Sequence, residues 1–189
     1  MPRPPILPTL DWKAIFERGK RYEQWIAQGE NGENRKKMEG ARWNFSIEPD
    51  VEGLLRSLPR PVHVAAIGED WCGDVVRHVP VLQRMADAAP NLKVRYFSRE
   101  DAREFFVRFL TNGGEAIPKF IFLSEKFIEC GNWGPMPEKC REIIARGKAC
   151  GGDEAARKKV SALYQADPTC REVVREILHL LDIASAGIP

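Results

Sequence analysis

Residues 62–80 read VHVAAIGEDWCGDVVRHVP, and this stretch decides how the rest of the chain is organised. Its first six residues have the length and the residue types of a buried strand. A polar turn follows, and a helical pattern begins beyond Trp71-Cys72-Gly73-Asp74. Cys72 is therefore predicted to lie at the start of a helix, among backbone N–H groups that have no partner inside that helix.

The chemistry of Cys72 is open to two interpretations. The positive end of a helix dipole stabilises a thiolate, which favours a reactive nucleophile. Asp74 acts in the opposite direction, because a carboxylate two residues away disfavours a second negative charge, although it also suits the start of a helix. In the alternative interpretation, Cys72 is a small apolar residue that packs at the helix start and performs no chemistry.

This order of strand, turn, Trp-Cys-Gly and helix resembles the thioredoxin superfamily, whose redox motif reads WCGPC. Pro80 follows Cys72 by eight residues, where thioredoxins carry the proline of the active-site helix. Ile117-Pro118, just before an apolar run, is similar to the cis-proline loop of that family. The EDWCGD sequence and the later Trp-Gly-Pro-Met-Pro at 133–137 resemble a bacterial thioredoxin-like branch.

The resemblance covers residues 45–150 and implies an α/β fold. We expect a central mixed sheet of four to five strands flanked by helices on both faces. Residues 1–44 are then an N-terminal helical extension, 45–150 the thioredoxin-like domain, and 151–189 a C-terminal helical extension. All three are expected to form one compact unit.

Three departures from the family pattern bear on the chemistry. The second motif cysteine is replaced by Val75, and the motif proline by Asp74. Ala66 stands where thioredoxins carry a buried acid that assists the resolving step. A lone thiolate can form a mixed disulfide but cannot expel its partner, so an ordinary dithiol mechanism is not available to this chain.

Two functions follow as expectations. The first is monothiol thiol–disulfide exchange through Cys72, with an external resolving thiol such as glutathione and a protein or low-molecular-weight thiol or disulfide as partner. The second is a non-catalytic protein-binding module that keeps the cis-proline peptide groove. In both, the residues expected to contact the partner are those around the motif and the proline loop: Trp71, Gly73, Asp74, Ile117 and Pro118.

Composition limits other functions. The net charge of +2 and the absence of a long basic block argue against nucleic-acid binding. The five cysteines form no Cys-x-x-Cys pair, so no zinc template and no metal site is predicted. No glycine-rich glutathione-binding stretch like that of monothiol glutaredoxins follows Pro118, so no cofactor is expected. Without an apolar signal segment or membrane span, we expect a cytoplasmic protein with free thiols.

Patterns elsewhere predict the remaining elements. Asp11 is expected to cap a helix that reaches Gln28, and two histidines are placed in opposite environments, His63 packed and His78 on the surface. The further expectations are a loop or frayed helix over 28–40, a short strand over 43–47, a helix starting at Pro49, a strand over 92–97, a helix bearing Phe105 to Leu110, a hairpin of 119–123 with 127–131, helices from Pro137 and over 153–165, and a last helix opened by a capping box of Thr169 and Glu172.

Overall fold

A computed structural model describes residues 7–187; residues 1–6 and 188–189, which belong to the two expected extensions, lie outside the described part. Its centre is a four-stranded mixed sheet with the order β2-β1-β3-β4. β1 (Val62–Ile67) and β2 (Leu92–Phe97) are parallel and are joined by α5 (Gly73–Ala88). β3 (Lys119–Leu123) runs antiparallel to β1 and forms a hairpin with β4 (Glu129–Trp133). The expected mixed α/β sheet is thus confirmed.

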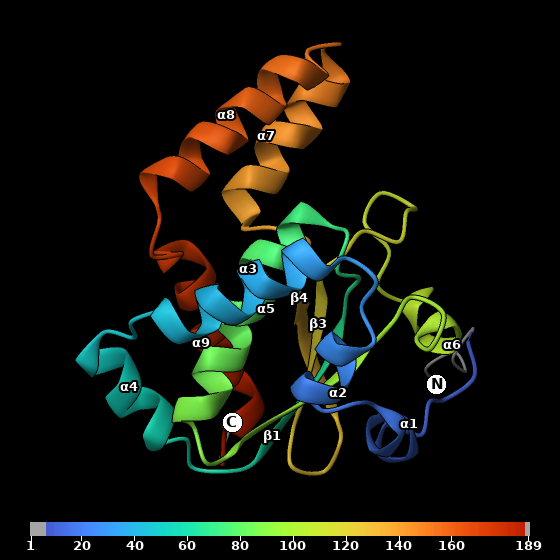
Figure 1. The fold of residues 1–189 in the computed structure, drawn as a ribbon. Coiled ribbons are helices and arrows are strands. Elements are labelled where there is room, and N and C mark those ends of the chain that lie inside the picture. Colours follow the sequence, from blue (N-terminus) through green and yellow to red (C-terminus); the bar gives the residue numbers. More distant parts are fainter. Residues whose placement is uncertain (1–6, 188–189) are drawn as a thin grey trace.

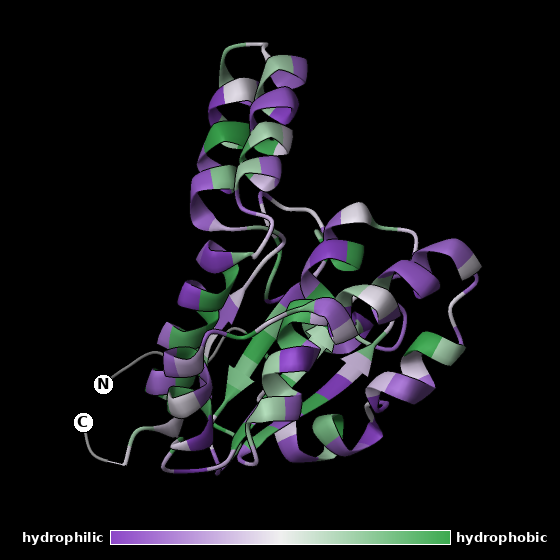
Figure 2. Ribbon diagram, turned by 60° about the vertical axis from the view of Figure 1, so that its left-hand side comes forward, coloured by the Kyte–Doolittle hydropathy of each residue, from purple (hydrophilic) through white to green (hydrophobic). Residues whose placement is uncertain are grey.

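Helices cover both faces of this sheet (Figure 1). One face, which carries Tyr96 and Phe120, packs against α5 and α9 (Arg171–Ser185). The Tyr96 hydroxyl donates to Gln83 of α5, and the indole N–H of Trp133, which stacks on Phe120 from β4, donates to Glu176 of α9. The opposite face contacts α1 (Trp12–Arg18) and α6 (Arg103–Phe106) through aromatic side chains, among them His63, which packs against Phe16 and Phe127 as expected. Figure 2 shows the apolar residues concentrated on the strands and on the helix faces turned toward them.

The N-terminal helix expected up to Gln28 is divided in two. Asp11 caps α1 as predicted, by accepting a hydrogen bond from the Ala14 N–H, but α1 ends at Arg18 and α2 (Tyr22–Ala27) follows. Between them Lys20 exchanges two backbone hydrogen bonds with Tyr96 at the edge of β2. A Cβ at Gly19 would lie 2.6 Å from the Arg95 Cβ, so only glycine lets the chain approach the sheet this closely.

The structure differs from two expectations for residues 28–47. The segment 28–40, expected to be a loop or a frayed helix, contains most of a regular helix, α3 (Gly32–Asn44), which is capped by Asn31 and packed on α5 with Met38 fully buried. Arg42 of α3 also connects this helix to α5, because its guanidinium donates two hydrogen bonds to the carboxylate of Asp87. The strand expected over 43–47 is absent from the described structure, because this segment ends α3 and leads directly into α4 (Pro49–Arg56). Tertiary packing on α5 outweighs the weak helix preference of the two glycines in α3.

The C-terminal helices divide into two groups with different packing. α7 (Glu138–Ala149) and α8 (Asp153–Ala166) pack on each other as a hairpin that projects from the rest of the molecule (Figure 1). α9 instead packs on the sheet, so residues 151–189 contain both one arm of the projecting hairpin and a helix of the core.

Three local expectations also differ from the structure. α9 has no capping box: its N-cap is Cys170, and the Asp167 carboxylate accepts from the N–H groups of Arg171 and Glu172. β4 begins at Glu129, because Phe127 has a positive φ of 59° and belongs to the turn. α6 spans four residues instead of the longer helix predicted. Of the apolar residues that follow it, Phe109 is buried in the core, whereas Val107 and Leu110 are exposed.

Candidate functional site

Cys72 is the N-cap residue of α5, immediately after the turn that follows β1. The Cys72 N–H donates to the carbonyl of Glu69, and its own carbonyl accepts the first hydrogen bond of the helix, from the Val76 N–H. The cysteine is half-buried, whereas the Trp71 side chain before it is 59% exposed. The sequence prediction that Cys72 lies at a helix start is therefore confirmed.

The turn before Cys72 is tied to segments that come much earlier in the chain. The buried Asp70 carboxylate accepts from the Asn31 N–H at 2.6 Å, and the Asn34 amide donates to the Asp70 carbonyl at 2.8 Å. The Trp25 indole N–H donates to the Gly68 carbonyl at 3.3 Å. The N-terminal helices thus hold the turn that presents the cysteine, a role that sequence reasoning did not assign to them.

The proline loop contacts the sulfur atom of Cys72. The Ile117–Pro118 peptide bond is cis, and both residues are buried. The Cys72 thiol donates to the Ile117 carbonyl oxygen, with Sγ and O 3.5 Å apart. The two segments are 45 residues apart in sequence, and the order of the sheet brings them together, since β1 and β3 are neighbours.

A second cis peptide bond, Gly134–Pro135, lies next to this loop. The buried Lys119 ammonium donates to the Gly134 carbonyl at 3.1 Å and to the Thr111 hydroxyl at 3.2 Å, which links the segments on either side of the proline loop. Burial, with a smaller effect of Arg141, lowers the pKa of Lys119 to about 8.

A thioredoxin family model matches residues 19–156, more than half of the chain. The chain belongs to the thioredoxin family. Two solved structures share the fold of this thioredoxin-family protein. A crystal structure of a protein of unknown function from Pseudomonas aeruginosa is 18% identical, covers 92% of this chain and 98% of its own, and gives a TM-score of 0.72. An HIV epitope-scaffold is 15% identical, with coverage of 92% and 98% and a TM-score of 0.69. No curated protein matches the sequence.

The thiol of this thioredoxin-family protein is not activated by its position. Burial raises the pKa of Cys72, the N–H groups of Val75 and Asp74 lower it, and the negative charge of Asp74 raises it; the net direction is upward from the ordinary value. The hydrogen bond to the Ile117 carbonyl also requires the protonated thiol. The helix dipole alone predicts the opposite direction, and it is outweighed because the half-buried thiol has lost much of its solvent.

The positions of the missing catalytic groups are filled by apolar side chains. Val75 is fully buried in the first turn of α5, and a Cβ on Gly68 would lie 3.2 Å from one of its methyl groups. Ala66 is also fully buried and pairs in the sheet with Tyr96 and Phe120, on the face that α5 covers. Neither position can move a proton or supply a resolving sulfur.

Behind Cys72 lies a polar cluster that sequence reasoning missed. Asp74 accepts a 2.8 Å hydrogen bond from the hydroxyl of Tyr164, which belongs to α8. His78, expected on the surface, is completely buried between Tyr164 and Trp133. His78 lies one helical turn after Asp74, so its place on the inner side of α5 is consistent with helical spacing, but no pattern in the sequence pairs it with a tyrosine 86 residues away.

The other cysteines are all free. Cys140 and Cys170 are buried on or before helices, Cys130 is half-buried on β4, and Cys150 is exposed. Within residues 7–187, no group of three or more potential metal-ligating side chains comes together. None of the helices in the same range has the length and hydropathy needed to cross a membrane.

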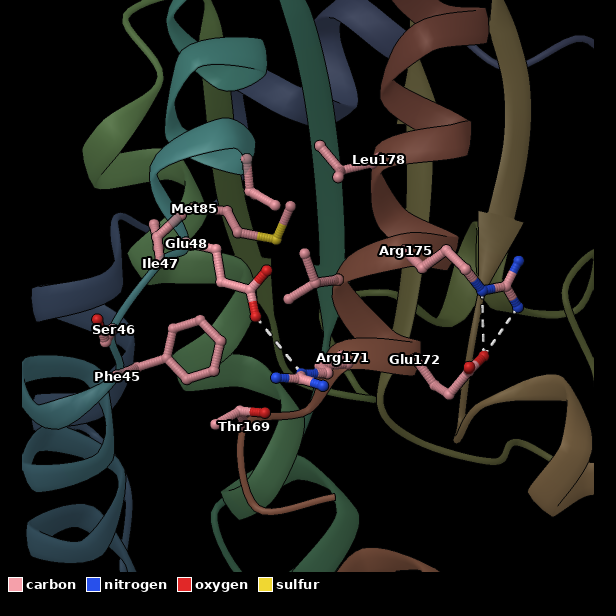
Figure 3. A pocket seen from close by; sticks show the side chains of 12 residues that line it. Phe45, Ser46, Ile47, Glu48, Met85, Thr169, Arg171, Glu172, Arg175 and Leu178 are labelled. Atoms are coloured by element: carbon pink, nitrogen blue, oxygen red, sulfur yellow. Dashed lines mark hydrogen bonds and ion pairs between the residues drawn. The ribbon is translucent and has the colours of Figure 1, made fainter. Parts of the chain in front are cut away.

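A further cavity lies away from Cys72. It has a volume of about 490 Å³ and is formed by the α3–α4 connection, Met85 of α5 and the first turns of α9. Figure 3 shows its side chains and the Glu48–Arg171 ion pair, which connects the α3–α4 segment to the first turn of α9. Met85 is 13 residues after Cys72 along α5, about 20 Å along the helix, so this cavity is separate from the cysteine site.

Proposed function

We propose that this protein carries out monothiol thiol–disulfide exchange through Cys72. The supporting observation is that the Cys72 sulfur, at the N-terminus of α5, lies 3.5 Å from the Ile117 carbonyl of the cis-proline loop. An extended substrate segment that pairs with the backbone beside Pro118 brings its own disulfide to this sulfur. The exposed Trp71 side chain flanks the same position and offers an apolar surface to such a segment.

The exchange occurs in two balanced steps. The Cys72 thiolate attacks one sulfur of a substrate disulfide, a mixed disulfide forms, and the other sulfur leaves as a thiolate. An external thiolate, from glutathione or a protein thiol, then attacks the substrate-derived sulfur of the mixed disulfide. A new disulfide forms between these two sulfurs, and Cys72 leaves as a thiolate. The second step needs the external thiol because Val75 supplies no sulfur.

The pKa of Cys72 predicts a slow reaction at neutral pH whose rate increases in alkali. Below the pKa, the thiolate fraction and hence the rate rise about tenfold per pH unit. We expect this slope to extend without a plateau to at least about pH 8.5, the ordinary value for a free thiol. The rate is measured by reacting the intact protein with a glutathionylated peptide at pH 6–9 and quantifying the mixed disulfide at Cys72 by peptide mapping.

Two controls accompany this measurement. Cys72→Ser must abolish the glutathione release that exceeds the reaction at the exposed Cys150, which is read in the same maps and reports how readily the reagent reaches a surface thiol. If Cys72 forms no mixed disulfide at any pH, the exchange proposal is wrong. Peptide binding that survives in Cys72→Ser would then indicate the alternative, a non-catalytic protein-binding module.

Val75→Cys tests whether the backbone around Cys72 is arranged for a dithiol. We expect the variant to fold, with a cost of about 1 kcal/mol for the smaller buried side chain, and to form an intramolecular disulfide between Cys72 and the introduced thiol under mild oxidation. Its turnover should remain weak, because Ala66 provides no proton acceptor. The disulfide is detected as the loss of two titratable thiols and a mass decrease of about 2 Da, since the bond forms with the loss of two hydrogens.

Val79→Cys is the matched control for that variant. Val79 is equally buried on α5 but lies about 10 Å along the helix from Cys72, beyond the reach of about 7 Å that a disulfide allows. A folded Val75→Cys protein that stays reduced, as Val79→Cys should, would show that the first turn of α5 is not arranged as in a dithiol protein.

A further inference from the structure

The Tyr164 hydroxyl joins the projecting hairpin to the helix that carries Cys72. It donates to the Asp74 Oδ1 at 2.8 Å, and the His78 Nε2 lies 3.3 Å from the same hydroxyl oxygen. A hydroxyl has one hydrogen, and here it is directed to the carboxylate. The His78 ring must therefore donate its N–H from Nε2 to the hydroxyl, which gives a directed chain from His78 through Tyr164 to Asp74.

Arg77 fixes the end of α8 against α5. Its Nη2 donates to the carbonyls of Tyr164 at 3.0 Å and of Asp167 at 2.6 Å, both at the C-terminal end of α8, where a cation is favoured. The same guanidinium lies 4.5 Å above the centre of the Tyr164 ring. Arg77 of α5 thus fixes Tyr164 through two contacts, one with its backbone carbonyl and one with its ring.

The carboxylate that Tyr164 holds in place, that of Asp74, acts on the thiol of Cys72. Burial raises the pKa of Asp74, and the hydrogen bond from Tyr164 is the largest effect that opposes this rise and favours the ionised carboxylate. Besides Tyr164 and Cys72, the charged or titratable groups that face Asp74 are Arg77 and Arg157, which favour its charge, the neutral His78 at 3.9 Å, and Cys140 of α7, whose pKa Asp74 raises. Among charged side chains, Asp74 is the one that acts on Cys72, and it disfavours the thiolate.

We propose that Tyr164 is a positioning residue for Cys72: its hydroxyl holds the ionised Asp74 carboxylate at the first turn of α5, so that the seating of the α7–α8 hairpin restrains the reactivity of the thiol. This inference rests on the proposed function, since it concerns the nucleophile of the exchange reaction. Loss of the hydroxyl leaves Asp74 either to take up a proton or to turn into water. Both outcomes weaken the negative potential at the sulfur.

The test is the pH profile of Cys72 alkylation by iodoacetamide in the otherwise intact protein, read by peptide mapping. Tyr164→Phe removes only the hydroxyl and should increase the rate at pH 7 about threefold, as the profile moves to lower pH by roughly half a unit. Asp74→Asn removes the charge but keeps an acceptor for Tyr164, and should increase the rate more. In the Asp74→Asn background, Tyr164→Phe should cause no further shift.

Tyr22→Phe is the matched control, because Tyr22 also has a buried hydroxyl, in this case without a hydrogen-bond partner among the described residues. It should leave the profile unchanged. An unchanged or alkaline-shifted profile in Tyr164→Phe would overturn the proposal, as would an equal shift with and without Asp74. Should Tyr164→Phe fail to fold, an unchanged profile in Asp74→Asn alone overturns it. The alkylation profile does not depend on disulfide exchange, so a protein that shows these shifts but forms no mixed disulfide would contradict only the proposed function.

Discussion

Gly134→Ala is expected to destabilise the protein by about 4 kcal/mol, near the upper end of single-residue effects. Gly134 has a φ of +117°, which side chains rarely adopt, and an added Cβ would lie 2.0 Å from the Pro118 carbonyl oxygen and 3.0 Å from its carbon. Both atoms belong to the backbone, so no side chain can rotate away. The proline loop would have to move, and with it the Ile117 carbonyl that contacts Cys72.

The measurement is denaturant-induced unfolding of the variant and the wild-type protein, together with the rate of Cys72 alkylation. Gly113→Ala separates the cost of the backbone conformation from the cost of the contact with Pro118. Gly113 also has a positive φ, of +78°, but an added Cβ there meets nothing within 4 Å. Its cost should be that of the backbone conformation alone, about 1 kcal/mol. Equal losses in the two variants would show that the contact with Pro118 does not hold the loop.

His78 should make the protein sensitive to acid. Burial, with a smaller effect of Arg77, lowers the pKa of His78 to about 3 in the folded protein, whereas an unfolded chain has a value of about 6.5. The unfolded state therefore binds the proton first, and the stability due to the neutral ring is lost as the pH falls from about 6.5 toward 3. Between pH 6.5 and 4 the loss should amount to roughly 3 kcal/mol in the free energy of unfolding.

His78→Leu isolates this effect, because a leucine cannot take up the proton. The variant should lose some stability at pH 7, where Tyr164 loses its donor, but its stability should decrease less steeply between pH 6.5 and 4. His179→Leu, at an exposed position, should follow the wild-type curve. Parallel curves for His78→Leu and the wild type would contradict the prediction. If His78→Leu does not fold, an NMR titration of the His78 ring in the wild-type protein decides, since the ring should stay neutral at pH 5.

Much of the fold could be predicted from the sequence because its signals are local. The strand at 62–67, the helix start at Cys72 and the N-cap at Asp11 depend on residues within a few positions of one another. The helix α3 could not be predicted in this way. Its own residues are polar and include two glycines, and it is stabilised by the buried Met38 and by contacts with α5 that lie far along the chain.

The candidate site, too, could be predicted from the sequence only in part. The sequence, through its resemblance to thioredoxins, predicted which residues meet at the site: Cys72 at a helix start and Ile117-Pro118 in the loop beside it. The structure brings these two segments together at one end of the neighbouring strands β1 and β3. Only the tertiary structure decided how the thiol behaves. Its pKa depends on lost solvent, on the Ile117 carbonyl and on a carboxylate held by Tyr164. Burial and hydrogen bonds between residues 45 and 90 positions apart leave no periodicity in the sequence, so electrostatics at this site is a property of the folded chain.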